Sequence, residues 1–430
     1  MKKMMLFNSK RSLLLAALLS GVCFASSAYA AEAGKAGDGF ISWRGPSGSG
    51  NFGEAALPRE WSDGQQIRWT TALPGRGASS PIVVGERIFV TSSDSENNTL
   101  SCVDTAGKVL WTTRFGEAAE AKNQKASAAN SSPVSDGKHV YAYFKSGELV
   151  CCDLEGSLTW SINVQDRYAE DTLWWDLGTS PVLTEDSVIV AVVQSGPSFV
   201  LSLDKSDGSE QWRTDRMMNV NEESNQAYTT PAVYNSDDGT LILTLGADHL
   251  TAHDADTGKE VFRVGGFNPT NHQYFRSIAS PVVVGDLAVC PYARGETLTA
   301  IRLGKDIPEG ERVAWRREDL GTDVPTPAVL GDRLFICGDK GQVTCLSAKD
   351  GKTVWEQPLP KHRRPYSSSP VVGGGLLYCT REDATTFVLD VESGKVIAEN
   401  KIEGETVATP VPNDGRLYLR TYDSLVCVGE

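Results

Sequence analysis

Residues 348–355, Ala-Lys-Asp-Gly-Lys-Thr-Val-Trp, repeat the pattern of residues 255–262, Ala-Asp-Thr-Gly-Lys-Glu-Val-Phe. In both stretches a turn containing Gly leads into a short run that ends on a large aromatic residue. The glycine supplies the positive φ that such a tight turn needs. Related stretches return along the whole chain, which indicates an architecture built from repeats.

A Ser or Thr followed by Pro opens each repeat. The pair occurs eight times at spacings of 40 to 52 residues, with the prolines at Pro81, Pro133, Pro181, Pro231, Pro281, Pro327, Pro370 and Pro410. Four short runs rich in β-branched and aromatic residues, separated by turns, follow every pair except the last, which is followed by three. This content is typical of one blade of a propeller. The sequence therefore predicts an all-β fold, an eight-bladed β-propeller of four-stranded blades.

The fourth run of each repeat has a recurring aromatic position. Its occupants are Trp69, Trp111, Trp160, Trp212, Phe262, Trp315, Trp355 and Ala398. The first of them precedes the first Ser-Pro pair, and the last repeat ends at Glu430 without a fourth run. We therefore expect the strand near residues 67–73 to complete the last blade, so that the ring has no open edge. The aromatic residues should pack between blades, each contributing up to about 5 kcal/mol, and the junction beside Ala398 should be the loosest.

The first thirty residues have the pattern of a secretory signal peptide. Four basic residues precede an apolar run at residues 13–19, and Ala28-Tyr29-Ala30 matches the small-residue cleavage pattern. We predict cleavage after Ala30 and a periplasmic or secreted protein. Residues 31–64 are predicted to be an N-terminal extension, and residues 65–430 the propeller. The remaining chain has no apolar run of about 20 residues, so no transmembrane segment is expected in it.

The charge of the chain excludes one class of partner. The formal net charge is −14, and removal of residues 1–30 leaves 37 basic and 55 acidic residues, a charge of −18. A surface of this sign repels phosphate backbones. Nucleic-acid binding is therefore not expected.

Eight cysteines remain after residue 30, an even number that would suit disulfides in an oxidising compartment. Their positions favour another interpretation, because most recur at two fixed places of the repeat: Cys102, Cys151, Cys345 and Cys427 at one, Cys290, Cys337 and Cys379 at the other. Free cysteine packs as a small apolar side chain. We expect unpaired cysteines between the blades.

The period of Ser-Pro-Val and Thr-Gly-Lys-x-x-Trp resembles the repeats of the pyrroloquinoline quinone (PQQ) family of propellers. Residues 43–50, Trp-Arg-Gly-Pro-Ser-Gly-Ser-Gly, are similar to a leader of PQQ-binding-like repeat proteins common in planctomycetes. The resemblance covers about residues 40–430 and is far more specific for fold than for chemistry. It implies two kinds of relative. Quinoprotein alcohol dehydrogenases bind PQQ and a divalent cation, whereas outer-membrane assembly scaffolds of the BamB type have the repeats without a cofactor.

In such propellers the loops before each Ser/Thr-Pro pair surround one mouth of the central channel, and several of these loops are rich in aromatic and polar residues. The candidate ligand-binding residues are Trp174, Trp175, Asp176, Glu222, Asn225, Gln226, Tyr228, His272, Tyr274, Arg276, Arg363, Arg364 and Tyr366. Arginine binds carboxylates with two parallel hydrogen bonds and aromatic rings stack on planar groups, so a flat anionic ligand would suit the mixture. The alternative is that these side chains bond to one another and fill the mouth, or form a surface for a partner.

The requirements of a quinoprotein enzyme are met only in part. The cation of such an enzyme needs hard oxygen ligands. Asp176 or Glu222 could lie near the cation while Trp174 or Trp175 stacks on the quinone. No complete set of cation ligands, however, can be matched by motif. Adjacent cysteines occur at Cys151-Cys152, inside a strand where alternation sends them to opposite faces.

We therefore predict no catalytic residue and no cofactor. The predicted function is that of a non-catalytic binding or scaffold protein in the cell envelope, with a protein or peptide partner at a channel mouth or blade edge. The alternatives are a dehydrogenase that uses PQQ with calcium, and a lectin-like propeller that binds carbohydrate.

Overall fold

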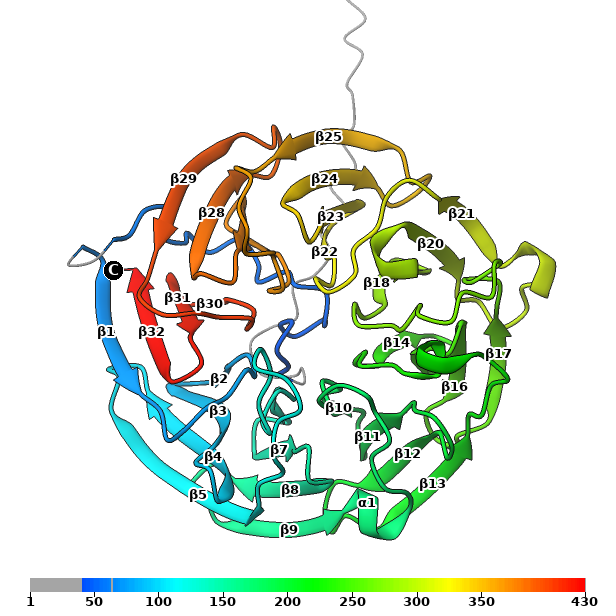
Figure 1. The fold of residues 1–430 in the computed structure, drawn as a ribbon, viewed down its shortest axis with the longest axis horizontal. Coiled ribbons are helices and arrows are strands. Elements are labelled where there is room, and N and C mark those ends of the chain that lie inside the picture. Colours follow the sequence, from blue (N-terminus) through cyan, green and yellow to red (C-terminus); the bar gives the residue numbers. More distant parts are fainter. Residues whose placement is uncertain (1–40, 63–64, 430) are drawn as a thin grey trace, which may run out of the picture. The chain divides into compact units, whose positions relative to one another are not determined.

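The computed structural model describes residues 41–62 and 65–429. The predicted signal peptide lies outside the described residues. Within them, 32 strands form eight four-stranded antiparallel sheets arranged as blades around a central channel (Figure 1). The predicted all-β, eight-bladed propeller is confirmed. No helix in these two ranges has the length and apolar character needed to cross a membrane.

Each blade runs outward from the channel, first strand innermost (Figure 1). Blades one to four consist of β2 (Ile82–Val84), β3 (Arg87–Ser93), β4 (Asn97–Asp104) and β5 (Val109–Glu117); β6 (Val134–Ser135), β7 (His139–Tyr143), β8 (Glu148–Asp153) and β9 (Leu158–Asn163); β10 (Val182–Leu183), β11 (Ser187–Val192), β12 (Phe199–Asp204) and β13 (Glu210–Asp215); β14 (Ala232–Ser236), β15 (Gly239–Gly246), β16 (His249–Asp254) and β17 (Glu260–Val264).

Blades five to eight continue the order. They consist of β18 (Val282–Val284), β19 (Leu287–Tyr292), β20 (Thr297–Arg302) and β21 (Val313–Arg317); β22 (Ala328–Leu330), β23 (Arg333–Cys337), β24 (Gln342–Ser347) and β25 (Thr353–Pro358); β26 (Val371–Gly373), β27 (Leu376–Thr380), β28 (Thr385–Asp390) and β29 (Val396–Lys401); β30 (Val411–Asn413), β31 (Arg416–Arg420), β32 (Ser424–Gly429) and β1 (Ile67–Ala72). Short helical turns lie in the loops: α1 (Val164–Arg167), η1 (Glu222–Asn225), η2 (Ala293–Gly295) and η3 (Glu309–Glu311).

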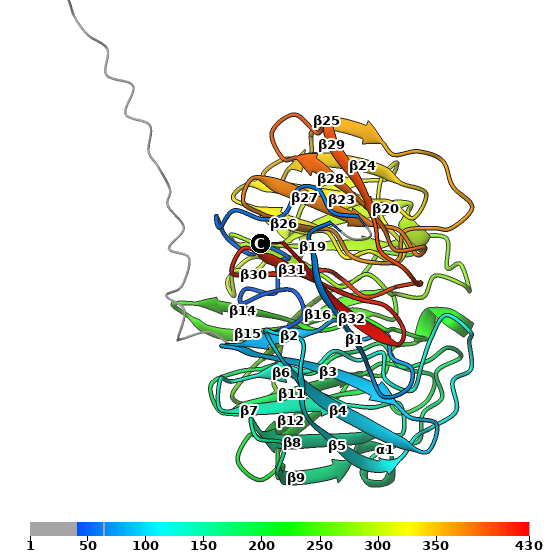
Figure 2. The same cartoon turned by 90° about the vertical axis from the view of Figure 1, so that its left-hand side faces the viewer.

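The last blade joins the two ends of the propeller, as the sequence predicts. β1 pairs antiparallel with β32, and Trp69 lies opposite Cys427. The side view shows β1 beside β32, at opposite ends of the colour scale (Figure 2). Backbone pairing therefore closes the ring, and no blade is left incomplete.

The recurring tryptophans pack against the next blade, and each indole also donates a hydrogen bond to it. Six indole nitrogens lie 2.7–3.1 Å from a backbone oxygen in the turn between the third and fourth strands of the following blade. Gly351 in one such turn has φ +68°, and a Cβ there would lie 2.7 Å from the ring of Trp315. The Gly of the repeat is thus required both by its backbone angle and by the close approach of the indole.

The expectation of a loose junction beside Ala398 is wrong. Trp61, from the segment before the propeller, fills the place that Ala398 leaves; its side chain is buried and stacks on Tyr378 with ring centroids 6.4 Å apart. Its backbone N–H donates to Oδ1 of Asn400 on the same blade. Phe262 is the other residue that replaces the recurring tryptophan, and the guanidinium of Arg312 lies 3.6 Å above its ring. Both gaps in the repeat are filled from elsewhere in the chain.

The Ser/Thr-Pro pairs form a closed ring of hydrogen bonds around the channel. Each Ser or Thr backbone N–H donates to the side-chain oxygen of the Ser or Thr in the next blade, at 2.8–3.2 Å, through the eight residues Ser80, Ser132, Ser180, Thr230, Ser280, Thr326, Ser369 and Thr409. The last of these bonds, from Thr409 back to Ser80, crosses the seam, which is the junction between blade eight and blade one. The repeated pair is thus explained by contact between blades.

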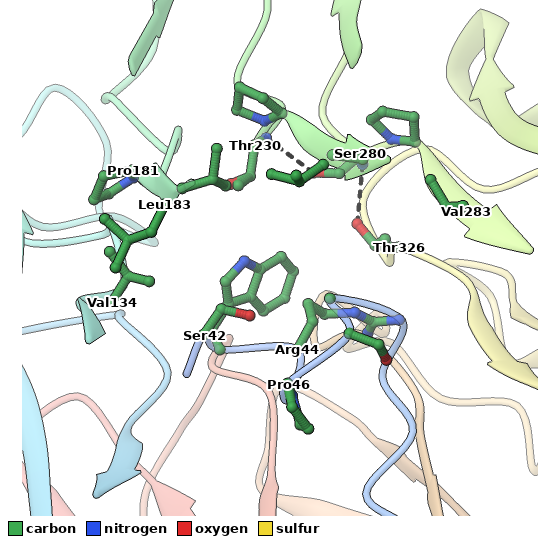
Figure 3. A pocket seen from close by; sticks show the side chains of 18 of the residues that line it. Ser42, Arg44, Pro46, Val134, Pro181, Leu183, Thr230, Ser280, Val283 and Thr326 are labelled. Atoms are coloured by element: carbon green, nitrogen blue, oxygen red, sulfur yellow. Dashed lines mark hydrogen bonds between the residues drawn. The ribbon is translucent and has the colours of Figure 1, made fainter. Parts of the chain in front are cut away.

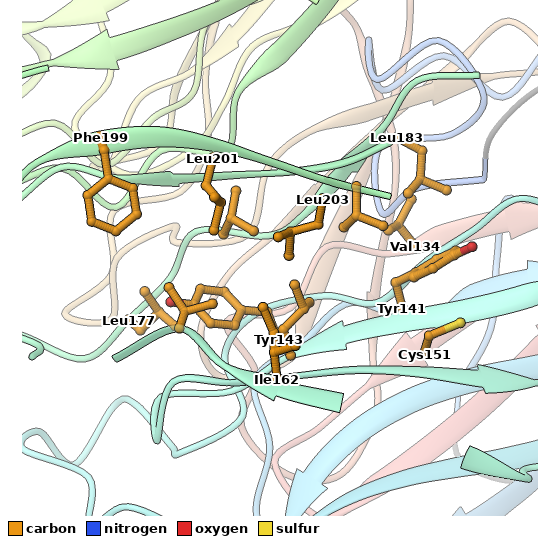
Figure 4. Close-up of a cluster of buried hydrophobic side chains, with 14 of the residues drawn as sticks. Val134, Tyr141, Tyr143, Cys151, Ile162, Leu177, Leu183, Phe199, Leu201 and Leu203 are labelled. Carbon is orange, nitrogen blue, oxygen red and sulfur yellow. The ribbon is translucent and has the colours of Figure 1, made fainter. Parts of the chain in front are cut away.

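The hydrophobic core is divided into layers between adjacent blades. One layer joins blades two and three through Tyr141, Cys151 and Leu201, among others (Figure 4). Cys152 belongs to the layer on the other side of β8, so the adjacent cysteines point to opposite faces as expected. The eight cysteines after residue 40 are buried free thiols, and burial raises the pKa of Cys151 and Cys152 to about 12.

Antiparallel order places the connections of every blade on two faces. The turns between second and third strands and the links from one blade to the next share one face, named here the loop face. The remaining turns share the opposite turn face. Residues 41–53, named here the leader, cross the channel toward the turn face, from a bridge between Ile41 and Ser135 to one between Asn51 and Val372.

Candidate functional site

Three exposed aromatic residues of the loop face, Trp174, Trp175 and Tyr274, are named here the aromatic patch. Arg294 links two of them, because it donates to the backbone oxygen of Tyr274 and to the Glu223 carboxylate that accepts from Trp175. The three aromatic residues have exposed fractions of 47%, 46% and 44%, which is unusual for large aromatic side chains. They lie on the loops that lead into blades three and five. Such exposed aromatic residues mark interaction surfaces when the backbone beneath them is fixed.

Buried polar side chains hold the backbone of the patch in place. Gln226 is fully buried, and its Oε1 accepts from the N–H of Trp174 at 2.7 Å. The hydroxyl of Tyr228 accepts from the N–H of Trp175 at 3.1 Å, and burial raises the pKa of this tyrosine. Gln226 and Tyr228 were predicted to bind ligand, whereas the structure places them beneath the patch.

A buried carboxylate fixes the side chain of Trp175. Glu223, 3% exposed, accepts from the indole N–H at 2.9 Å and pairs with Arg294 at 2.7 Å. Arg276 lies 3.5 Å from the same carboxylate and 3.0 Å from Asp323. The carboxylate therefore balances two cations while it orients one aromatic ring. Its neighbour in the predicted set, Glu222, is exposed and has φ +39°.

Asp176 belongs to a second buried network. Its carboxylate forms an ion pair with Lys145, with both side chains at least 95% buried, and accepts from the N–H groups of Lys122 and Asn123. Both carboxylate oxygens of Asp176 therefore accept from donors of the protein. The side chain thus ties the loop before blade two to the loop before blade three.

Two further predicted residues, His272 and Asn225, make contacts within their own loops. His272 stacks on Phe275 at 4.3 Å, and its Nδ1 accepts from the N–H of Tyr274. Asn225 donates to the backbone oxygen of Val220.

Of the two predicted arginines in the loop before blade seven, Arg363 is exposed and Arg364 pairs with Glu405. Tyr366 is buried in the core between blades six and seven, with Phe387 at 6.3 Å. The structure does not bring the thirteen predicted residues into one pocket.

A large cavity lies on the loop face, among the loops and turns of blades one, two, seven and eight. We name it the loop-face cavity; its volume is about 700 Å³, and it is lined by Arg76, Ala121, Lys122, Asn123, Gln124, Lys125, Ala126, Arg364, Glu382, Glu405 and Tyr422. The guanidinium of Arg76 lies 3.5 Å over the ring of Tyr422. The volume of the loop-face cavity is within the range of pockets for small ligands, about 300–1,000 Å³.

A smaller cavity of about 150 Å³ lies between the leader and the first strands of blades three to five (Figure 3). Arg44 of the leader is buried, donates to the backbone oxygens of Pro370 and Pro327, and has its pKa lowered to about 9 by burial. The leader thus fills the channel at this end, and the cavity beside it is lined by proline, aliphatic and hydroxyl side chains of the surrounding blades together with Trp43 and Arg44.

The residues do not fit a quinone site with a cation. Asp176 is already engaged by Lys145, and Glu222 is exposed. In the described ranges, His, Cys, Asp and Glu side chains form no group of three or more that could hold a metal ion. Cys151 and Cys152 lie on opposite faces of a strand. We therefore derive no chemical step through PQQ.

Sequence reasoning missed the turns between second and third strands. Lys145, Arg294, Glu382 and Tyr422 all lie in these turns and contribute to the loop face. Strand direction supplies the missing signal, because an even number of strands separates these turns from the loops between blades. Both kinds of connection must therefore emerge on one face.

Comparison with known proteins gives one family. The family described as "Outer membrane protein assembly factor BamB" matches residues 60–197, 172–307, 306–396 and 361–428. The protein of that name from Shigella dysenteriae is 31% identical over 148 residues, which is 34% of this chain and about a third (35%) of that protein's length. The protein of that name from Moranella endobia is 23% identical over 351 residues, 79% of this chain and 82% of that protein.

Solved structures show the same fold. BamB from Moraxella catarrhalis has a TM-score of 0.61 at 17% identity, covering 85% of this chain and 99% of its own. A europium-containing methanol dehydrogenase has a TM-score of 0.65 at 13% identity, covering 88% and 89%. At these identities the likeness concerns the fold alone.

Proposed function

The chain belongs to the family of the outer membrane protein assembly factor BamB, and on that basis we propose that it is a non-catalytic binding protein of the cell envelope. The loop face would dock a protein partner through the aromatic patch. Its role would be that of a scaffold in outer-membrane protein assembly, as the name of its relatives indicates. Export by the predicted signal peptide agrees with this location.

One observation carries the proposal: the patch is exposed, yet rigidly supported. Trp174 and Trp175 are nearly half exposed while their backbone N–H groups bond to buried Gln226 and Tyr228. Aromatic anchors that are ordered before binding lose little conformational entropy when a partner covers them. An enzyme pocket would instead direct its polar groups toward a substrate.

Photo-crosslinking in the producing organism tests the proposal. A photoreactive amino acid at position 174 or 274 should give a discrete adduct with one envelope protein. The same group at Leu158, which is 51% exposed on the outer strand β9, is the matched control and should not give that adduct. Adducts that are identical from all three positions, or absent from 174 and 274, would contradict the proposal.

The quinoprotein alternative has its own measurement. Because PQQ itself carries carboxylates, thermal unfolding with PQQ and Ca²⁺ should, under our proposal, give the same change in Tm in Trp175→Ala as in the wild type. A ligand at about 100 times its Kd would stabilise the fold by roughly 2.7 kcal/mol. A rise in Tm that is lost in Trp175→Ala would favour a PQQ site at the patch over a protein surface.

A further inference from the structure

The lining of the loop-face cavity is more cationic than the chain as a whole. Four lining residues are basic and two are acidic, whereas the chain has a formal net charge of −14. Lys122 pairs with Asp171 outside the lining, Lys125 with Glu382 and Arg364 with Glu405, so Arg76 supplies the excess positive charge. A positive site on a negative molecule attracts anions selectively, because the surrounding surface repels them. The basic residues are Arg76, Lys122, Lys125 and Arg364; the acidic ones are Glu382 and Glu405.

Arg76 is the strongest candidate anchor for an anion. Its side chain donates to two neutral backbone oxygens, of Ala126 at 3.2 Å and Gln124 at 2.6 Å, and lies flat on the ring of Tyr422. The hydroxyl of that tyrosine donates to the backbone oxygen of Lys125 at 2.8 Å. These contacts orient the guanidinium, and among residues 41–62 and 65–429 no carboxylate pairs with it, a state suited to bidentate binding of a carboxylate.

The two acidic residues of the cavity differ in their surroundings. Glu382 has a side chain 5% exposed, accepts from Ser367 Oγ and pairs with Lys125 at 3.0 Å, so it is part of the wall. Glu405 is 48% exposed and pairs with Arg364, itself 37% exposed. Ion pairs as exposed as this one contribute little to stability, because water competes for both charges. A carboxylate from outside can therefore replace Glu405 on Arg364.

We propose that the loop-face cavity binds a ligand carrying two or more carboxylates, which bridge Arg76 and Arg364. The leader crosses the channel on the turn face, so the ligand enters from the loop face. The shared chemistry is polycarboxylate, supplied either by a free small acid or by an acidic peptide segment. None of the three residues of the aromatic patch lines the cavity, so this site does not depend on the proposed partner surface.

Calorimetric titration of the purified protein at low salt tests the site with two probes, citrate and an acetylated, amidated triglutamate peptide. The triglutamine peptide is the neutral control. Heat with citrate alone indicates a free small acid as the source, and heat with triglutamate indicates an acidic segment. No heat with either probe at millimolar concentration, or equal heat with triglutamine, would overturn the proposal.

Charge variants locate the bound probe. Arg76→Gln should weaken binding about tenfold and Arg364→Gln several-fold, but Arg76 also supports the loop at residues 121–126 and its loss could act indirectly. Glu405→Gln removes the competing carboxylate and should tighten binding about threefold, a gain that damage to the fold does not produce. Weaker or unchanged binding in Glu405→Gln would refute the bridging geometry.

Two further variants complete the test. Arg263→Gln, in an ion pair with Glu260 on the outer strand β17, has the same charge change outside the cavity and should leave the affinity unchanged. Trp175→Ala should also leave it unchanged while removing the crosslink to a protein partner. Loss of probe binding in Trp175→Ala would place the probe at the aromatic patch instead.

Discussion

At the scale of the residue, one histidine occupies a position that is apolar elsewhere in the ring. His253 on β16 lies opposite Ile242, in the register that holds Val103, Cys152, Leu203, Ile301, Leu346, Leu389 and Val428 in the other blades. It is fully buried, and neither ring nitrogen has a hydrogen-bond partner in the described part of the chain. Burial, with Arg216 nearby, lowers the pKa from 6.5 to about 4.

This residue should make the protein sensitive to mild acid. In the unfolded chain this histidine binds a proton at about pH 6.5, whereas in the folded chain it does so only near pH 4. The free energy of unfolding should therefore decrease by up to about 3 kcal/mol as the pH falls from about 6.5 to about 4. His253→Leu should raise stability at pH 5 and flatten the dependence, as measured by urea unfolding at several pH values. Ile301→Leu, at the equivalent position of the next blade, removes no titratable group and should keep the wild-type slope. An unchanged slope in His253→Leu would contradict the assignment.

At the scale of the element, the segment before β1 acts as part of blade seven. Trp61 belongs to the buried cluster that contains Tyr378, Leu417 and the partly buried Ala398. The hydroxyl of Tyr378 donates to the backbone oxygen of Pro58 at 2.8 Å. A segment that the repeat pattern leaves out therefore completes the packing of the repeat that lacks a tryptophan.

Trp61→Ala should cost about 3–5 kcal/mol, the usual range for removing a buried tryptophan. Chemical denaturation measures the loss, and Leu158→Ala on the exposed side of β9 should change stability by less than about 0.5 kcal/mol. Ala398→Trp introduced into the Trp61→Ala variant should recover part of the loss by restoring the arrangement of the other blades. A cost below about 1 kcal/mol for Trp61→Ala would show that the junction does not depend on this indole.

At the scale of the whole molecule, closure depends on two kinds of bond. β1 pairs with β32 along the outer part of blade eight, and the ring of Ser/Thr-Pro hydrogen bonds continues across the seam from Thr409 to Ser80 at 2.8 Å. The equivalent bond inside the ring, from Ser132 to Ser180, is 2.9 Å. The seam thus has the same inner geometry as a junction between consecutive blades.

Ser80→Ala and Ser180→Ala should therefore have equal effects. Each leaves one buried backbone N–H without its acceptor, at a cost of about 1–3 kcal/mol. Thermal unfolding followed by circular dichroism should show one cooperative transition in both variants. An additional early transition in Ser80→Ala alone would show that the seam opens before the rest of the ring.

The sequence by itself determined the eight blades, their strands and their closure. A blade is formed by strands that follow one another in the chain, so its turns, alternation and recurring Trp and Ser/Thr-Pro positions are visible as a local period. The cysteines and repeat tryptophans were placed correctly for the same reason. The loops rich in aromatic and polar residues were also recognised as the loop face.

Only the tertiary structure decided how the side chains of those loops pair. Glu223 contacts Trp175, Arg276 and Arg294, which lie 48 to 71 residues away, and Trp61 reaches a strand more than 300 residues later. Asp176, Gln226 and Tyr228 became supports because buried polar groups must find partners within the protein. Such pairing depends on the positions of loops from different blades, and no local pattern records it.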